Sequence, residues 1–226
     1  RGNFLACQGL RLLNYPFALS KKFISLPPSI TSSKELIIFS SVFEERLEKL
    51  NGLSDNPQGN YILYVMEASI REDFNFSLEF AVQKANELNK PLLVSFFITD
   101  KYKHSNVRYY KFMIEGVLKT KKVLEERGIR LVIQKDDYVN GTLRLSKKAV
   151  CVVLDKNYLR TQRRWREKIA QNCQVAVYQL ENDVVVPISL VSDRAIPYAY
   201  LYRDRVNKLI DRFLKPIETM STFNLQ

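Results

Sequence analysis

Apolar residues change their spacing several times along this chain, and the changes predict separate strands and helices. Short continuous apolar runs are typical of buried strands, whereas apolar positions three or four residues apart are typical of helices with one buried face. The strands expected on this basis are Tyr61–Met66, Pro91–Thr99, Ile129–Gln134, Ala149–Asp155 and Val175–Leu180. The expected helices are Val42–Leu50, Asn75–Leu88, Ser105–Arg127, Tyr138–Lys147, Leu159–Cys173 and Ile196–Leu214.

The alternation of strands with helices predicts an α/β fold. Right-handed crossovers between successive strands place such strands parallel in one sheet. We expect a five-stranded parallel sheet in the order 3-2-1-4-5, with helices on both faces and the strand from Tyr61 at its centre. In the helix Ser105–Arg127 one stripe should face the sheet, formed by Tyr109, Met113, Val117, Thr120 and Leu124.

The first part of the chain differs from the rest. Pro16, Pro27 and Pro28 interrupt it, and no period is sustained. We therefore expect a flexible N-terminal extension over residues 1–41, an α/β domain over 42–195, and a C-terminal helix with a tail over 196–226. The acid-free, Arg/Lys/Ser composition of the first residues leaves an organelle transit peptide open as an alternative.

Composition narrows the class of protein. No apolar run reaches the ~18 residues of a membrane span, so no membrane partner is expected. Three cysteines and one histidine make neither a metal site nor a Cys-His catalytic pair, and no Ser-His-Asp set is present. Buried reduced thiols fit an intracellular location, with the cytoplasm as the expectation and the nucleus or an organelle left open.

The net charge of +11 is spread unevenly. Five basic and no acidic residues lie before Glu35, which leaves 30 basic against 24 acidic residues from there on. Arg160, Arg163, Arg164 and Lys168 share one face of the helix Leu159–Cys173. A solvated face is the simplest interpretation, and contact with phosphate or an acidic neighbour is the alternative.

Polar side chains gather where three of the expected strands end. Because the carboxyl ends of parallel strands meet at one edge of a sheet, these side chains should lie together there. No glycine-rich phosphate loop follows any strand, so we expect a ligand held by side chains, with tyrosine faces beside cations suiting a flat, partly anionic ring. Helix capping is the alternative role for such residues. The candidates are Glu67, Ser69, Arg71, Asp100, Tyr102, Arg108, Asp155, Tyr158 and Arg160.

At these same segments the chain resembles the N-terminal domain of class II cyclobutane pyrimidine dimer photolyases. The resemblance covers about residues 42–218. Its most specific part is Tyr158-Leu-Arg followed by Gln162 and a run of arginines, and then Asp183-Val-Val-Val-Pro187. The other matching stretches are residues 61–81, 85–91, 106–116 and 127–129. Two departures are Val65 in place of the usual Trp and Glu67 in place of the frequent Gln, a carboxylate that would repel an anionic deazaflavin.

The resemblance implies a Rossmann-like module that holds a light-harvesting antenna, an 8-hydroxydeazaflavin in class II enzymes. The antenna passes excitation to reduced FAD, which in this family lies in a C-terminal helical domain that is absent from this chain. The resemblance therefore implies a part of a light-driven DNA repair lyase that is not catalytic alone, with FAD and DNA as partners only in a full-length context. The helical domain, or another chain, should dock through residues 197–214, where Tyr198, Tyr200 and Tyr202 crowd one short segment.

Two other interpretations stay open at this point. One is a free-standing relative that kept the fold, lost the photochemistry and binds a nucleotide-like ligand or a protein partner. The other is a nucleic-acid binder that uses the Arg160–Lys168 face, although the base-reading features of known modules are not evident.

Overall fold

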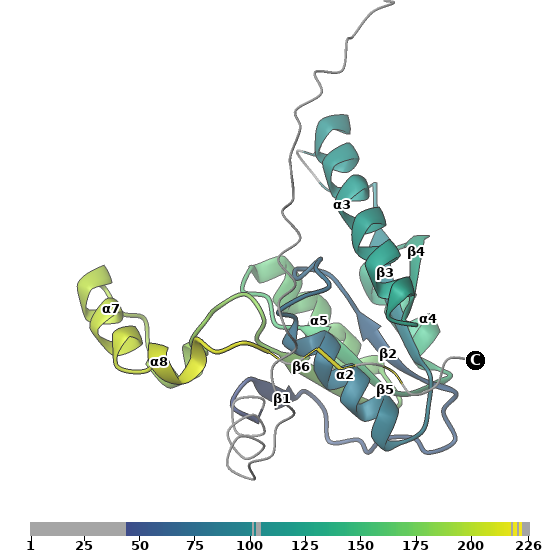
Figure 1. Ribbon diagram of the computed structural model, residues 1–226, viewed down its shortest axis with the longest axis horizontal. Helices are drawn as coiled ribbons and strands as arrows, with labels where there is room; N and C mark the ends of the chain where they lie inside the picture. Colours follow the sequence, from purple (N-terminus) through teal and green to yellow (C-terminus); the bar gives the residue numbers. More distant parts are fainter. Residues whose placement is uncertain (1–43, 101, 103–104, 218, 221, 223–226) are drawn as a thin grey trace, which may run out of the picture.

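A six-stranded sheet forms the centre of the computed structural model, which describes residues 44–100, 102, 105–217, 219–220 and 222. The strands lie in the order β1-β6-β5-β2-β3-β4 (Figure 1). Their bounds are β1 Leu47–Lys49, β2 Tyr61–Val65, β3 Leu92–Ile98, β4 Arg130–Lys135, β5 Ala149–Asp155 and β6 Ala176–Leu180. The pairings among β2 to β6 are all parallel, with β2 between β3 and β5. This confirms the predicted order and the central place of the strand from Tyr61.

The sixth strand was not expected. A helix was predicted over Val42–Leu50, but Leu47–Lys49 instead forms β1, which pairs antiparallel with β6. Residues 42 and 43 lie outside the described part of the chain. The outer side of β6 would otherwise present unpaired backbone N–H and C=O groups, and β1 satisfies them. Tertiary pairing thus overrides the local helical pattern here.

Two pairs of helices cover the two faces of the sheet. On one face lie α2 (Phe76–Glu87) and α3 (Val107–Glu126), and on the other lie α4 (Tyr138–Ser146) and α5 (Arg160–Asn172). The first face holds the larger core, around Ile62, Tyr64 and Leu78, and the second packs around Leu63, Val152 and Ile169. Alternate residues of β2 therefore enter opposite cores, as the two-residue period of a strand requires.

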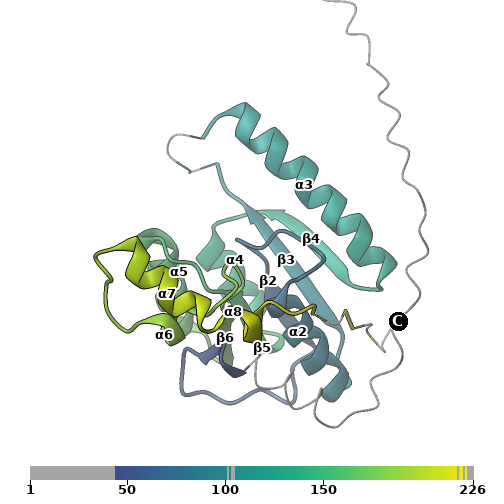
Figure 2. The same cartoon turned by 60° about the vertical axis from the view of Figure 1, so that its left-hand side comes forward.

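Only part of α3 follows the predicted inward stripe. Val117, Thr120 and Leu124 are buried and Met113 is half-buried, but Tyr109 is 51% exposed. Its prediction as an inward residue is wrong because the N-terminal half of α3 runs out past the end of the sheet (Figure 2). Periodicity marks the face of a helix that is apolar, but not how far along the helix the sheet extends.

After β6 the chain leaves the sheet as an arm of three short helices, α6 (Ile188–Val191), α7 (Ala199–Asn207) and α8 (Ile210–Phe213). The predicted single helix Ile196–Leu214 is therefore wrong. At the break the bonds are of the tight three-residue kind, from Leu209 N–H to Val206 and from Arg212 N–H to Leu209. Arg212 pairs with Glu45 at 2.5 Å, and this contact holds α8 against the segment that leads into β1.

The last described residues return from the arm to the body of the domain. Ile217 and Met220 pack against the α2–α3 core. The N–H of Met220 donates to Glu79 at 2.8 Å, and its carbonyl accepts from Arg127 at 2.8 Å. Arg127 and Glu79 themselves form an ion pair of 2.8 Å, so one buried pair fastens the segment. No helix in the described part of the chain is long and apolar enough to cross a membrane.

Candidate functional site

The turn that follows β2 is held by the carboxylate at the end of β5. Asp155 is fully buried, and its Oδ2 accepts from the backbone N–H groups of Glu67, Ala68 and Ser69 at 3.1 to 3.2 Å. Its Oδ1 accepts from the Tyr64 hydroxyl at 2.9 Å. With the amide of Asn182 at 3.4 Å, five donors converge on one carboxylate, and Asp155 thereby fixes the shape of the turn.

The polar side-chain atoms of Ser69 and Arg71 also form hydrogen bonds within the chain. The Ser69 hydroxyl donates to Asp183 at 3.0 Å, and the Arg71 guanidinium donates to the carbonyls of Asn182 at 2.8 Å and Phe74 at 3.2 Å. Ser69 is fully buried. The two residues connect the turn to the segment that follows β6. Their role in the structure is therefore to hold the shape of the site.

Two buried asparagines complete this support. The side-chain oxygen of Asn75 caps α2 by accepting from Leu78 N–H, and its amide donates to the carbonyls of Ser69 and Arg71. Asn182 donates to the Asn75 oxygen at 2.7 Å and accepts from Phe76 N–H at 2.7 Å. Sequence reasoning missed both residues, although an Asn directly before a helical stripe is a capping signal.

Above this base lies the Glu67 cluster, which we define as Glu67, Tyr102, Tyr138, Asn157, Gln162 and Trp165. The amide of Gln162 donates to Glu67 Oε1 at 2.9 Å, and the amide of Asn157 donates to Glu67 Oε2. Trp165 contacts Tyr138 at 5.4 Å and Tyr102 at 6.2 Å between ring centroids. A carboxyl group with two amide partners therefore lies beside three aromatic rings.

Burial controls the proton affinities in this cluster. It raises the pKa of Glu67 to about 7, with a further rise from the nearby charge of Asp155 and a partial opposing effect from the amides of Gln162 and Asn157. Burial and the negative field of Glu67 raise the pKa of Tyr102 to about 12. Burial also raises the pKa of Tyr138 well above its usual range, and its hydroxyl has no hydrogen-bond partner among the described residues.

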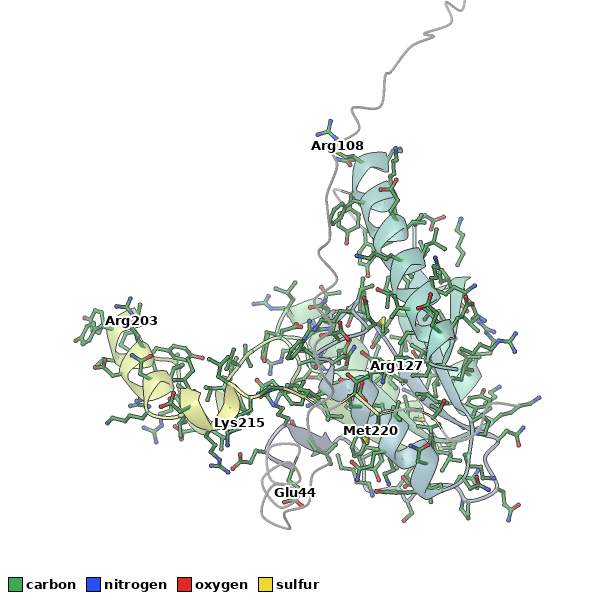
Figure 3. All side chains as sticks on the ribbon, viewed as in Figure 1. Glu44, Arg108, Arg127, Arg203, Lys215 and Met220 are labelled. Atoms are coloured by element: carbon green, nitrogen blue, oxygen red, sulfur yellow. The ribbon has the colours of Figure 1, made fainter. Side chains whose placement is uncertain are left out.

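The other candidates lie apart from the Glu67 cluster. Asp100 is exposed and pairs with Lys135 at 2.7 Å. Arg108 lies at the outer tip of α3, away from the body of the domain (Figure 3), and Arg160 is exposed at the first position of α5. Tyr158 donates its hydroxyl to Glu181, next to the end of β6. The nine predicted residues thus fall into three groups. Ser69, Arg71 and Asp155 support the turn, Glu67 and Tyr102 belong to the Glu67 cluster, and the other four lie elsewhere.

Asn157 and Gln162 were not among the predicted site residues. Both sit inside the segment that was singled out, Asn157 two residues after β5 and Gln162 in the first turn of α5. Their amide groups gave no distinct signal because a polar residue at the start of a helix usually faces solvent. Only the position of the turn after β2 makes them partners of Glu67.

Among the described residues, the remaining His, Cys, Asp and Glu side chains form no metal centre, since no three of them are placed to hold a metal ion. Cys151 and Cys173 are both buried and free, and burial raises the pKa of the Cys151 thiol to about 12. A thiol with so high a pKa is a poor nucleophile at neutral pH.

Comparison with known proteins places this arrangement in a family. The model of the DNA photolyase family matches residues 63–221, which contain all five parallel strands except the first two residues of β2. The chain belongs to the DNA photolyase family. Over 176 residues it is 35% identical to the deoxyribodipyrimidine photo-lyase of Methanothermobacter thermautotrophicus, which covers 78% of this chain and 40% of that protein. It is 24% identical over 157 residues to the enzyme of the same name from Arabidopsis thaliana, covering 68% of this chain and 32% of that one.

Solved photolyases share the fold. An archaeal photolyase from Sulfolobus tokodaii superposes on 72% of this chain and 38% of its own with a TM-score of 0.56 at 18% identity. A class III photolyase from Agrobacterium tumefaciens gives a TM-score of 0.51 at 17% identity, covering 66% of this chain and 31% of its own. The chain thus spans less than half the length of the photolyases that it matches, and the matched part has their Rossmann-like α/β fold.

Proposed function

We propose that this chain is the antenna-binding α/β domain of a class II photolyase, and that it acts in light-driven DNA repair only together with an FAD-binding helical domain. The observation that carries the proposal is the position of the Glu67 cluster. It lies at the carboxyl ends of β2 and β5, which are the adjacent strands where the strand order reverses. In open α/β sheets ligands bind at this switch point.

The residues of the Glu67 cluster suit a flat heterocycle of the 8-hydroxydeazaflavin type. Trp165 and Tyr102 offer ring faces, while Glu67, Asn157 and Gln162 offer hydrogen bonds to ring carbonyl and N–H groups. The unpartnered Tyr138 hydroxyl supplies one more donor in the same cluster. Because burial raises the pKa of Glu67 to about 7, this side chain is largely neutral in slightly acidic solution and repels an anionic chromophore less than a full charge would.

When bound, the chromophore would supply light absorption and energy transfer, and the chain's residues would hold it in place. The carboxyl of Glu67 and the amides of Asn157 and Gln162 would hold the edge of the heterocycle, and the aromatic side chains would exclude water from its face. The photolyase of Sulfolobus tokodaii was solved with two FAD molecules, which implied a novel light-harvesting cofactor in that protein. A flavin is therefore the alternative chromophore to be tested.

Trp165 makes the proposal directly testable, because it is the only tryptophan of the chain. We expect 8-hydroxydeazaflavin to quench Trp165 fluorescence with saturation, and Tyr102→Ala to weaken that binding by about tenfold through the lost ring contact. Arg108→Gln, at the far tip of α3, is the control and should bind like the unchanged chain. If FAD quenches and deazaflavin does not, the chromophore assignment is wrong. If neither quenches, the site does not bind an antenna.

The arm supports the second part of the proposal, docking of the helical domain through residues 197–214. Tyr198 and Tyr200 are 59% and 58% exposed and stack on each other, and Leu214 is 66% exposed. Large apolar side chains gathered on a surface mark interaction sites. Without the helical domain, the chain should associate with itself through this patch at micromolar concentration.

Sedimentation velocity tests the docking surface. The unchanged chain should sediment faster as its concentration rises, and Tyr198→Glu should remove that dependence by placing a charge in the patch. Val107→Glu on α3, also strongly exposed at 84%, serves as the control and should leave the association unchanged. A chain that stays monomeric over the whole range would contradict a docking role for the arm.

A further inference from the structure

A pocket of about 620 Å³ lies between α5, the end of β6 and α6, next to the Glu67 cluster, with which it shares Asn157. Its lining includes Arg163 and Arg166 from α5, Tyr158 from the turn between β5 and α5, Gln179 from β6, and Glu181 and Ile188 from the segment that follows β6. Small-molecule sites usually have volumes of roughly 300–1,000 Å³. The pocket is therefore large enough for a ligand of moderate size.

One wall of the pocket carries two arginines of α5, together with Glu167 from the same helix. Arg166 is only 6% exposed; its Nε donates to Gln179 at 2.7 Å and its Nη2 donates to the Asn157 carbonyl at 2.6 Å. Its Nη1 has no hydrogen-bond partner among the described residues. Arg163, one turn earlier, is exposed, and none of the ion pairs between described residues involves it. The two guanidinium groups together suit an anion.

The position of Arg166 is fixed by a chain of side chains. Gln179, which accepts from Arg166, donates its own amide to Glu48 at 2.7 Å, and Glu48 also pairs with Lys156 at 3.3 Å. Gln179 is buried as well. A buried guanidinium with two fixed bonds and one free N–H group is preorganised for a further acceptor, and an unmade bond there is unfavourable.

The other side of the pocket presents an acceptor. Glu181 is 1% exposed, and its Oε1 accepts from the Tyr158 hydroxyl and from Ile188 N–H. Its Oε2 has no partner in the described part of the chain. A ligand that satisfies it must supply an N–H or O–H donor. Tyr158, 40% exposed, and Ile188 add an aromatic and an aliphatic surface beside it.

We propose that this pocket binds a nucleoside monophosphate. The phosphate would lie against Arg163 and Arg166, the base would contact Tyr158 and Ile188, and an amino group of the base would donate to Glu181. The phosphate of such a ligand matches the unpartnered Nη1 of Arg166 and the guanidinium of Arg163. The N–H donor of its base matches the unpartnered Oε2 of Glu181. The pocket shares only Asn157 with the Glu67 cluster, and neither Arg163 nor Glu181 belongs to that cluster, so binding here can be tested apart from antenna binding.

Calorimetric titration of the full 226-residue chain with AMP tests the proposal. We expect saturable binding, weakened about tenfold or more by Arg163→Gln because a charge-assisted hydrogen bond is lost. Arg164→Gln removes the same charge from the next position of α5, which does not line the pocket, and should leave the affinity unchanged. Since Arg163 is exposed, this variant should fold normally, which circular dichroism would verify.

Two further titrations separate the parts of the ligand. Adenosine and inorganic phosphate should each bind more weakly than AMP, because each satisfies only one side of the pocket. Equal affinities for AMP and phosphate would overturn the proposal in favour of a simple anion site. Equal weakening by Arg163→Gln and Arg164→Gln would overturn it in favour of diffuse charge attraction, and so would the absence of AMP binding at millimolar concentration.

Discussion

At the scale of single residues, two carboxyl groups play different roles at the two strand ends that form the site. Asp155 satisfies three N–H groups of the turn after β2, whereas the side chain of Glu67, a residue of that turn, accepts from two side-chain amides. Burial raises the pKa of Glu67 to about 7, so this side chain can exchange a proton near neutral pH.

Glu67 therefore makes stability depend on pH. Its pKa is about 7 in the folded chain against an ordinary value of 4.5, so between these values the folded form keeps a proton that the unfolded form loses. Stability from this residue is complete below pH 4.5 and is lost as the pH rises through 7. Glu67→Gln removes that loss and should raise the free energy of unfolding by ~1–2 kcal/mol at pH 8, with little change at pH 4.5.

Urea denaturation at the two pH values measures this effect. Glu115→Gln, on the exposed side of α3, is the control, because its side chain is 64% exposed and should give the same small change at both. An equal effect of Glu67→Gln at pH 4.5 and pH 8 would show that the side chain matters through its packing and not through its charge.

The sequence was enough to place the site residues at strand ends. It was not enough to show which of them bond within the protein and which face the ligand site. The run into Glu67 and the run into Asp155 both end a buried strand, and both were named as ligand candidates. The partners that distinguish them are far along the chain, as with Asn182, which bonds to Asn75 across 107 positions. Such pairings depend on which strands become neighbours, and no local pattern contains that information.

At the scale of elements, the packing of α4 on the sheet determines how Phe97, Tyr138 and Trp165 contact one another. Gly141 of α4 has no room for a side chain, since an added Cβ would come within 2.3 Å of the Phe97 ring. The Phe97 ring also packs edge-on against Tyr138, at 6.4 Å between centroids, and Tyr138 contacts Trp165. The small residue on α4 therefore sets the distance between helix and sheet under the Glu67 cluster.

Gly141→Ala should lower the free energy of unfolding by about 1–3 kcal/mol through overpacking, and should change the emission of Trp165. Gly116→Ala is the matched substitution on α3, where an added Cβ meets nothing within 4 Å. It should stabilise the chain by up to about 1 kcal/mol through helix propensity and leave the emission unchanged. Identical emission spectra for both variants would contradict the coupling of α4 to Trp165.

The prediction of elements was most successful where burial is strongest. The bounds of β5 match the expected strand at both ends, since all seven of its residues are buried. The prediction was wrong at β1 and in the arm, where single contacts decide the conformation. The pairing of β1 with β6 and the ion pair of Arg212 with Glu45 are both contacts between distant segments. A local helical pattern cannot anticipate them.

At the scale of the whole molecule, one ion pair connects the end of the described chain to the first core. Arg127→Ala leaves Glu79, which is 2% exposed, without its charged partner, and removes the donor to Met220. Breaking a buried pair in this way costs about 3–5 kcal/mol. We expect that loss in urea denaturation, together with faster hydrogen exchange at the Met220 amide, which donates to Glu79.

Arg130→Ala on the exposed edge of β4 is the control and should change neither measurement. If the Met220 amide stays protected in Arg127→Ala, the segment is held by the packing of Ile217 and Met220 alone. In that case a smaller apolar residue at position 220, as in Met220→Ala, should release it.

The return of Met220 to the space between α2 and α3 also determines how the arm responds to a pulling force. An arm attached at one end only is extended by a force on its free end. This arm is instead attached at both ends, by β6 on one side and by Glu79 and Arg127 on the other (Figure 3). A load applied beyond Met220 is first borne by the anchor at Glu79 and Arg127. The arm is therefore shielded from tension until that anchor yields.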